Sequence, residues 1–353
     1  MASLHQLPVE LIRCVLSFLG TEPPSLRNVH AEPSEQLFHP GSKPLKNLSE
    51  TCRSLHQLLF CEIFTYLIFS PEHVDSLLSF VKVNKLSNQI KSVVIYHNDL
   101  HDHKREGPSK LQTRTAMFQI LTSIDPGALT IAMPPSCMSA VTAIDIDLKS
   151  EWLFRIPFQI LRLEQPSPPV CRQSRPTGLS IFDCRRWTHC TYNEGSSMPA
   201  YKTYEHFNFK IPSIIRSLDM ANFVQGPPLE NLTSFDLVTV FPFGHIQYTL
   251  QFFTSLRSLQ ILRTQMAPEI GSESSKITSG GLHAPQPDFW TEFENIYQEL
   301  KAWVLRSCPP HLRTFVVLDF RNEGLRERVL GLFSRQDLPG WKHQGRGEWV
   351  KQE

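Results

Sequence analysis

The sequence predicts an α/β protein in which a small N-terminal helical module is followed by an irregular solenoid of short strands. Two observations support this fold class. Apolar residues recur at helical spacing near the N-terminus, and from residue 61 onward short apolar runs alternate with polar or Pro/Gly-containing stretches. We therefore expect a helical module over residues 1–60, a strand-rich region over 61–340 and a polar tail over 341–353.

The first predicted helix begins at Leu7 and Pro8. Proline fits the first turn of a helix, because its missing N–H would have no partner there. Glu10 lies in the same turn, where the positive end of the helix dipole favours a carboxylate. The apolar positions that follow form one stripe, made of Leu11, Ile12, Val15, Leu16 and Leu19. So short a helix is not stable alone in water and needs a partner.

The partner helix is expected over residues 44–60, a leucine-rich segment. Its apolar residues fall near helical spacing, at Leu45, Leu48, Cys52, Leu55 and Leu59. An insert over residues 21–43, rich in Pro, Ser, His and Glu, separates the two helices. Added loop length of this kind costs little entropy, so the insert is compatible with packing of the two helices.

A Leu-Pro-x-Glu-Leu helix followed by a leucine-rich helix with Cys-Arg-x-Leu resembles the F-box. The matching residues are Leu7, Pro8, Glu10, Leu11, Val15, Leu16, Leu19, Leu48, Cys52, Arg53 and Leu55. The match departs from the family at the insert, because a usual F-box closes this gap with a few residues. The order of parts along the chain is similar to that of F-box proteins of filamentous fungi.

The resemblance implies a substrate-recognition subunit of a Skp–cullin–F-box (SCF) ubiquitin ligase. In that role the helices dock on a Skp-type adaptor and through it on a cullin–RING ligase, while the rest of the chain recruits an unknown protein. The implied adaptor-binding residues are Leu7, Pro8, Glu10, Leu11, Ile12, Val15, Leu16, Leu19, Leu48, Cys52 and Leu55. Leu48, Cys52 and Leu55 are expected to be shared between this contact and the module's own core. The resemblance implies no catalytic residues and no cofactor.

Short strands are expected throughout the region after residue 61. The segments are Leu67–Phe69, Ser92–Tyr96, Ala128–Ile131, Ala143–Ile146, Ile160–Leu163, Gly178–Ile181, Arg216–Met220, Thr233–Leu237, Leu256–Ile261 and Leu312–Val317. Phe253–Leu262 and Leu229–Leu237 resemble leucine-rich repeats, but the uneven spacing predicts a degenerate solenoid with insertions. The outward strand positions would be Ser217, Asp219, Ser234, Asp236, Ser258 and Gln260. A generic α/β domain with parallel strands is the alternative.

Three stretches interrupt this pattern, and one strong helix follows them. Loops are expected over residues 165–177, 193–199 and 265–288 because of their Pro, Gly, Ser and Asn content. After Asp288 the apolar positions again fall on one side of a helix, at Phe289, Phe293, Ile296, Leu300 and Val304. We expect this helix to end near Cys308, which two prolines follow.

Composition excludes several classes of function. The 353 residues carry a formal net charge of +1, which gives no support for nucleic-acid binding. The most apolar run, Leu58–Phe69, is too short to span a membrane. The eight cysteines form no C-x-x-C pair. This usage favours a reducing cytoplasmic or nuclear compartment.

One run could carry metal chemistry. His97, Asp99, His101, Asp102 and His103 follow a predicted strand, as ligands of a metal-dependent hydrolase would. Their spacing does not match the H-x-H-x-D-H pattern, and a solvated polar loop is the simpler interpretation.

Two smaller groups of residues resemble parts of functional sites. Cys184, His189 and Cys190 are too few for a structural zinc site, which needs four ligands. Asp145 and Asp147 would share a strand face and could form an acid–base pair or a polar strand face. Binding to the SCF adaptor is therefore the leading hypothesis. An F-box scaffold acting outside a ligase and a metal-dependent hydrolase are the alternatives.

Overall fold

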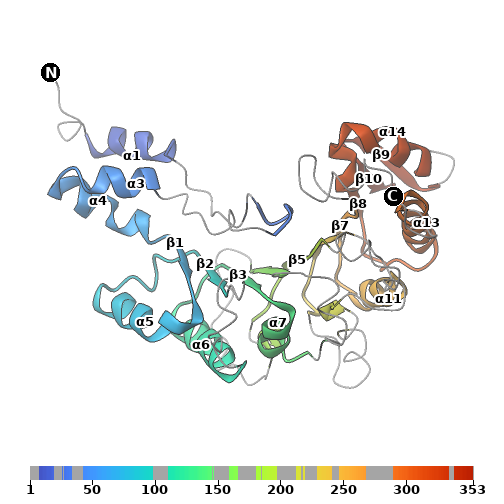
Figure 1. The fold of residues 1–353 in the computed structure, drawn as a ribbon. Helices are drawn as coiled ribbons and strands as arrows, with labels where there is room; N and C mark the ends of the chain where they lie inside the picture. The colour runs from blue at the N-terminus through green and yellow to red at the C-terminus, as the bar shows by residue number, and fades with distance from the viewer. Residues whose placement is uncertain are drawn as a thin grey trace.

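The fold is mixed α/β, and the described strands form a single ten-stranded sheet. The computed structural model describes residues 8–19, 26, 28–33, 43–97, 110–144, 146, 159–165, 180–183, 185–196, 212–215, 218, 229–240, 246–267, 289–333 and 338–352. The strand order is β1-β2-β3-β4-β5-β6-β7-β8-β10-β9, so neighbours in the chain are neighbours in the sheet until the last hairpin. Figure 1 shows the strands along the inner side of an arc and helices α5, α6, α7 and α11 along its outer side.

The elements are short and alternate between strand and helix over much of the chain. The strands are β1 (Tyr66–Phe69), β2 (Ser92–Tyr96), β3 (Ala128–Met133), β4 (Gln159–Glu164), β5 (His189–Ser196), β6 (Ser234–Val240), β7 (Ile261–Gln265), β8 (Thr314–Val317), β9 (Trp341–Gly345) and β10 (Glu348–Lys351). The α-helices are α1 (Val9–Ser17), α3 (Lys43–Ser49), α4 (Arg53–Ile63), α5 (Val74–Val83), α6 (Lys110–Ser123), α7 (Pro135–Thr142), α11 (Ile246–Ser255), α13 (Phe289–Arg306) and α14 (Glu323–Leu332). Short 3₁₀ helices are η3 (Pro71–His73), η5 (Ile181–Asp183) and η7 (Leu318–Arg321).

Strand direction is mostly parallel but changes at β4. The pairs β1–β2, β2–β3, β5–β6, β6–β7 and β7–β8 are parallel. β4 pairs antiparallel with both β3 and β5, and β10 pairs antiparallel with β8 and β9. A regular solenoid adds strands in one direction only, and the described sheet departs from that expectation at β4 and again at the β9–β10 hairpin.

The two faces of the sheet differ in chemistry because successive side chains of a strand point to opposite sides. One face packs under the helices and forms the main core. Its buried strand residues include Leu129, Leu161, Tyr192, Phe235, Leu262 and Phe315. The face that these helices leave uncovered, which we call the open face, carries Thr130, Arg162, Thr191, Asp236 and Arg263, which the strand register places opposite one another.

The N-terminal helices have a core of their own. Ile12 and Leu16 of α1 pack with Leu45 of α3 and with Leu55, Leu59 and Ile63 of α4. The single helix expected over residues 44–60 is wrong, because α3 ends at Ser49 and α4 begins at Arg53. The hydroxyls of Ser49 and Thr51 each donate to a carbonyl three residues earlier, at 2.7 Å, which competes with continuation of the helix.

Six of the ten expected strand segments are confirmed, namely those beginning at Leu67, Ser92, Ala128, Ile160, Thr233 and Leu312. Three others are wrong where the structure describes them. Ala143 ends α7 in a left-handed conformation with φ of 56°, Ile181 begins η5, and Leu218 is helical. In the segment Leu256–Ile261 only Ile261 belongs to a strand, because Leu256 and Leu259 are buried in the turn that precedes β7.

Two regions expected to be polar and irregular form strands instead. Residues 341–351, expected as a polar tail, form the hairpin β9–β10, in which Trp341 and Trp349 are buried. The loop expected from Asn193 is wrong as far as Ser196, because β5 continues through it. The helix after Asp288 is confirmed as α13. In the part of the chain that the structure describes, no helix combines the length and apolar character needed to cross a membrane.

Candidate functional site

The two sides of α1 divide the predicted adaptor-binding residues into a buried and an exposed set. Ile12 and Leu16 are buried in the N-terminal core, and Leu55 of α4 is buried with them. Leu11 and Val15, on the adjacent flank of α1, are 52% and 41% exposed. Ile12, Leu16 and Leu55 therefore form the N-terminal core, whereas Leu11 and Val15 are the residues that a partner could contact.

The remaining predicted adaptor-binding residues that the structure describes are either exposed or half-buried. Pro8 and Glu10 are exposed, and the carbonyl of Pro8 accepts the first hydrogen bonds of α1. Leu19, Leu48 and Cys52 are half-buried against the N-terminal core. Leu7 lies outside the described residues.

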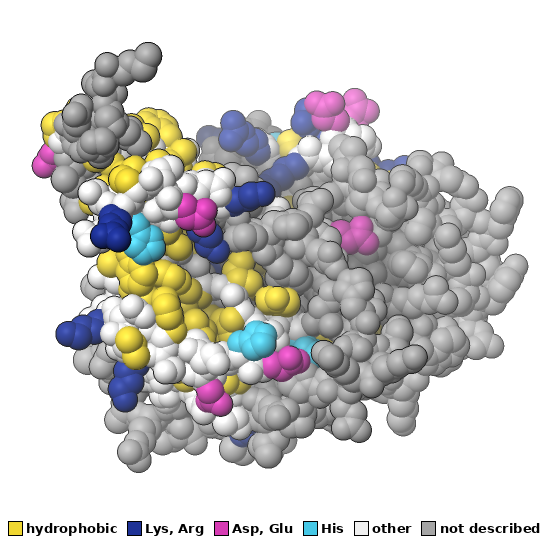
Figure 2. Space-filling view, turned by 60° about the vertical axis from the view of Figure 1, so that its left-hand side comes forward, with side chains coloured by type: hydrophobic (Ala, Val, Ile, Leu, Met, Phe, Trp, Pro, Cys, Tyr) yellow, Lys and Arg dark blue, Asp and Glu magenta, His cyan; other side chains and the backbone are white. Residues whose placement is uncertain are grey.

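Phe18 extends the exposed side of α1, and sequence reasoning missed it. It directly follows α1 and is 83% exposed. Leu11, Val15 and Phe18 stand at positions i, i+4 and i+7, which places them in one row; we call this row the α1 stripe. The spacing itself was the signal, since Phe18 lies three residues after Val15. Figure 2, in which this end of the molecule comes forward, shows hydrophobic side chains gathered on the surface.

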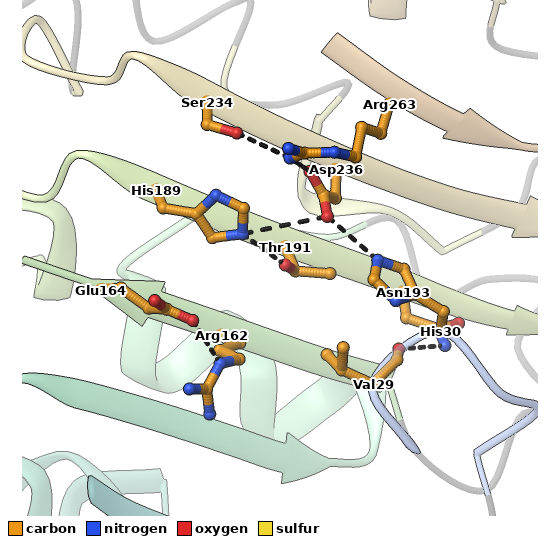
Figure 3. A network of polar contacts seen from close by, with 10 residues as sticks. All are labelled: Val29, His30, Arg162, Glu164, His189, Thr191, Asn193, Ser234, Asp236 and Arg263. Atoms are coloured by element: carbon orange, nitrogen blue, oxygen red, sulfur yellow. Dashed lines mark hydrogen bonds and ion pairs between the residues drawn. The ribbon is translucent and has the colours of Figure 1, made fainter. Parts of the chain in front are cut away.

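A network of polar side chains occupies the open face of the sheet (Figure 3). Its centre is Asp236 of β6, which is buried. Asp236 accepts a hydrogen bond from His30 Nε2 at 3.0 Å and another from Arg263 at 2.9 Å. Arg263 also donates to the hydroxyl of Ser234 at 3.0 Å. Ser234 and Asp236 were expected to be exposed strand positions, and that expectation is wrong because both are buried.

The pKa values of this network follow from burial and charge. Burial alone would raise the pKa of Asp236, but the hydrogen bond from His30, together with the charges of His189 and Arg263, lowers this pKa below its ordinary value. His189 lies 3.9 Å from Asp236, and burial lowers the pKa of its ring against the opposing charge of Asp236. Asp236 is therefore ionised at neutral pH, and its carboxylate accepts hydrogen bonds from Arg263 and His30.

Part of the insert contributes to this face. Residues 28–33 lie on the inner side of the arc (Figure 1), where the Nδ2 of Asn193 donates to the carbonyls of Val29 at 2.9 Å and Ala31 at 2.8 Å. Val29 is buried against Ala132 and Ile160 of the open face. A short stretch of the insert is therefore held on the sheet by hydrogen bonds from the Asn193 side chain, by the hydrogen bond between His30 and Asp236, and by an apolar contact.

The predicted metal candidates are not brought together in the residues that the structure describes. His97 is buried at the end of β2, and the other members of its run lie outside those residues. His189 and Cys190 are neighbours in β5 and point to opposite faces, and burial raises the pKa of the Cys190 thiol. Cys184, Asp145 and Asp147 are not described. Within the described part, no group of three or more His, Cys, Asp or Glu could hold a metal ion.

Comparison of the chain with family models, with curated proteins and with solved structures finds no match in any of the three. The functional argument therefore depends on the residues and contacts described above.

Proposed function

We propose that this chain is a substrate-recognition subunit of an SCF ubiquitin ligase. Its N-terminal helices would act as an F-box that docks on a Skp-type adaptor, and the sheet would present its open face to the protein to be ubiquitinated. The observation that carries this proposal is the α1 stripe, an exposed apolar row on a helix whose adjacent side already fills the N-terminal core. The sequence resemblance supplies the kind of partner.

The energetics of docking agree with such a role. Burial of an exposed leucine or phenylalanine contributes on the order of 1.5–3 kcal/mol, and a few such anchors usually carry most of an interface's energy. Leu11, Val15 and Phe18 can be covered by a partner without disturbing Ile12 and Leu16, which hold α1 against α4. The helices therefore do not have to rearrange in order to bind.

The recognition region would be a degenerate relative of a leucine-rich-repeat solenoid. The consecutive strand order and the helices along one side of the arc support this assignment, whereas the reversed strand β4 is a departure from it. Solenoids commonly bind proteins on their concave side. The substrate would accordingly bind on the open face, which already holds residues 28–33.

The test is recovery of partners from a eukaryotic lysate with the tagged full chain. The variant Leu11→Asp/Phe18→Asp places two charges in the α1 stripe and should lose both the Skp adaptor and the cullin that the wild type recovers. The control is Phe80→Asp/Val83→Asp, which alters two exposed apolar residues of α5, 38% and 76% exposed. This control should retain both partners.

Three outcomes decide the proposal, provided that thermal melts show all proteins folded. Loss of both partners in the α1 variant alone supports it. Recovery of the adaptor without a cullin by the wild type indicates a scaffold outside a ligase. Recovery of neither partner by the wild type, or equal recovery by the two variants, overturns the docking assignment.

A further inference from the structure

A pocket of about 790 Å³ opens on the same side of the sheet, over strands β7, β8 and β10. Its apolar lining comes from Ile261 of β7, Val316 of β8 and Phe320 of η7. Because η7 follows β8 directly and the turn of the β9–β10 hairpin packs on it, the pocket lies where the last strands, η7 and α14 meet. A space of this volume exceeds what a single ion or water cluster needs and falls in the range of ligand pockets.

The polar lining is strongly unbalanced in charge. Arg263, Arg321, Arg326 and Arg346 come from four different parts of the chain, and Glu348 is the one carboxylate among the described residues that line the pocket. Arg263 already pairs with Asp236. Among the described residues Arg321, Arg326 and Arg346 have no carboxylate within ion-pair distance, which leaves three guanidinium groups against one carboxylate.

Arg326 contacts an aromatic ring and Arg346 lies in a tight turn, and neither feature neutralises the charge of the arginine. The guanidinium of Arg326 lies over the ring of Phe320, 5.5 Å from its centroid. Arg346 sits in the β9–β10 turn with φ of +53°, between Gly345 and Gly347, which also have positive φ. Turn positions with positive φ favour Gly, Asn or Asp, so arginine is conformationally unfavourable at position 346. Backbone strain of this kind is common at binding sites.

The neighbouring surface already binds an extended segment of polypeptide. Residues 28–33 lie against strands β4 to β6 through backbone carbonyls and through His30, which is bound to Asp236. Asp236 in turn binds Arg263, which lines the pocket. The pocket is therefore contiguous with a surface whose chemistry suits an extended chain.

We propose that this pocket binds an acidic peptide segment, whose carboxylate or phosphate oxygens pair with Arg321, Arg326 and Arg346 while an apolar side chain packs on Phe320. Guanidinium groups bind both oxyanions in bidentate geometry, so the two sources share one recognition chemistry. The formal net charge of +1 for the whole chain gives no support for nucleic-acid binding. Only the identification of this peptide as part of the recruited substrate rests on the function proposed above.

Fluorescence anisotropy with the full chain tests the site. The probes are a labelled octapeptide of glutamate and leucine, its counterpart with glutamine for glutamate, and a version with phosphoserine at its centre. The pocket variant Arg321→Gln/Arg346→Gln should bind the acidic probes at least tenfold more weakly than the wild type. The control Arg186→Gln/Arg257→Gln makes the same charge change at exposed positions outside the pocket and should bind as the wild type does.

The three probes and two variants distinguish the possible outcomes. Preference for the phosphoserine probe identifies phosphate as the favoured oxyanion, and preference for the glutamate probe identifies carboxylates. Equal affinity of the glutamine probe, equal weakening by the two variants, or no binding of any probe by the wild type overturns the proposal. Adaptor recovery by the pocket variant is measured in parallel, and because it depends on α1 it should not change. Failure of the peptide site is thus distinguishable from failure of the SCF assignment.

Discussion

His30 and Asp236 are 206 positions apart in the chain, yet the imidazole of His30 donates a hydrogen bond of 3.0 Å to the Asp236 carboxylate. This contact joins the insert between the N-terminal helices to the middle of the sheet. It lies beside the pocket that Arg263 lines, so the insert, the polar network and the pocket form one continuous surface. The predictions below test the parts of this surface and the core that supports it.

Asn193 is predicted to hold the insert on the sheet. Asn193→Ala removes both hydrogen bonds to the carbonyls of Val29 and Ala31, and each such bond contributes about 1 kcal/mol. Hydrogen–deuterium exchange should become faster in residues 28–33 and remain unchanged in α13. The matched control is Asn84→Ala on the exposed end of α5, where the amide bonds only the carbonyl of Phe80. Equal protection of residues 28–33 in wild type and Asn193→Ala would contradict this role.

His30 is predicted to set the ionisation of Asp236. Because the hydrogen bond from His30 helps to lower the pKa of Asp236, His30→Ala should raise that pKa, as followed by NMR of the carboxyl carbon. A folded-state pKa below the unfolded value gives stability that is present above the unfolded pKa and is lost as pH falls through the folded pKa. The acid limb of unfolding should therefore move to higher pH in His30→Ala. His56→Ala, an exposed histidine on α4, is the control and should leave both quantities unchanged.

Asp319 should make the stability of the protein depend on pH in the opposite sense. Burial raises the pKa of Asp319 to about 6, although Tyr297 and the amides of Met266 and Ala267 donate to its carboxylate. The folded state then holds the proton more tightly than the unfolded chain, so stability falls as pH rises from about 4 to 6 and is level above.

Asp319→Asn should remove this dependence. In the wild type, the free energy of unfolding should fall by on the order of 3 kcal/mol between pH 4 and 7. Urea titration at several pH values should show that this fall is absent from Asp319→Asn. Asp75→Asn, on the exposed side of α5, serves as the control for a carboxylate outside the core. The assignment is wrong if the pH profile of Asp319→Asn is parallel to that of the wild type.

Gly347 is predicted to be essential for the packing of the β9–β10 turn against η7. A Cβ atom at this position would lie 2.5 Å from both the Cβ of Phe320 and the carbonyl oxygen of Val317, and φ is +77°. Gly340 has a similar φ of +81°, and a Cβ atom there would have no atom within 4 Å. Gly340→Ala therefore reports the backbone strain alone. We expect Gly340→Ala to cost about 1 kcal/mol and Gly347→Ala at least 2 kcal/mol more. Similar melting temperatures for the two variants would show that the hairpin can shift to accommodate the methyl group.

Elements with a strong local pattern could be predicted from the sequence. Ser92–Tyr96 is a continuous β-branched and aromatic run and forms β2 as expected, and α13 follows the spacing of Phe293, Ile296 and Leu300. In both cases the residues that specify the element are its own. The hydrophobic period is therefore enough to predict it.

Elements whose polar residues are buried could not be predicted in this way. Asn193 and Glu194 were predicted to lie in a loop, but both are buried in β5, where residues far away in the chain bond to their side chains. Ala143–Ile146 reads as a strand, but Ala143 terminates α7 in the left-handed region. A segment of four residues is too short for its pattern to tell a strand from a helix end, so local preference does not decide its structure.

The sequence by itself determined that residues 9–17 form a helix with an apolar stripe and that short strands recur along the chain, because both depend on the spacing of neighbouring residues. Only the tertiary structure decided that Ile12 and Leu16 are buried while Leu11, Val15 and Phe18 are exposed. It alone placed His30 on Asp236 and gathered Arg263, Arg321 and Arg346 around one pocket. The physical reason is that burial and pairing depend on groups far away in the sequence, which no local pattern records.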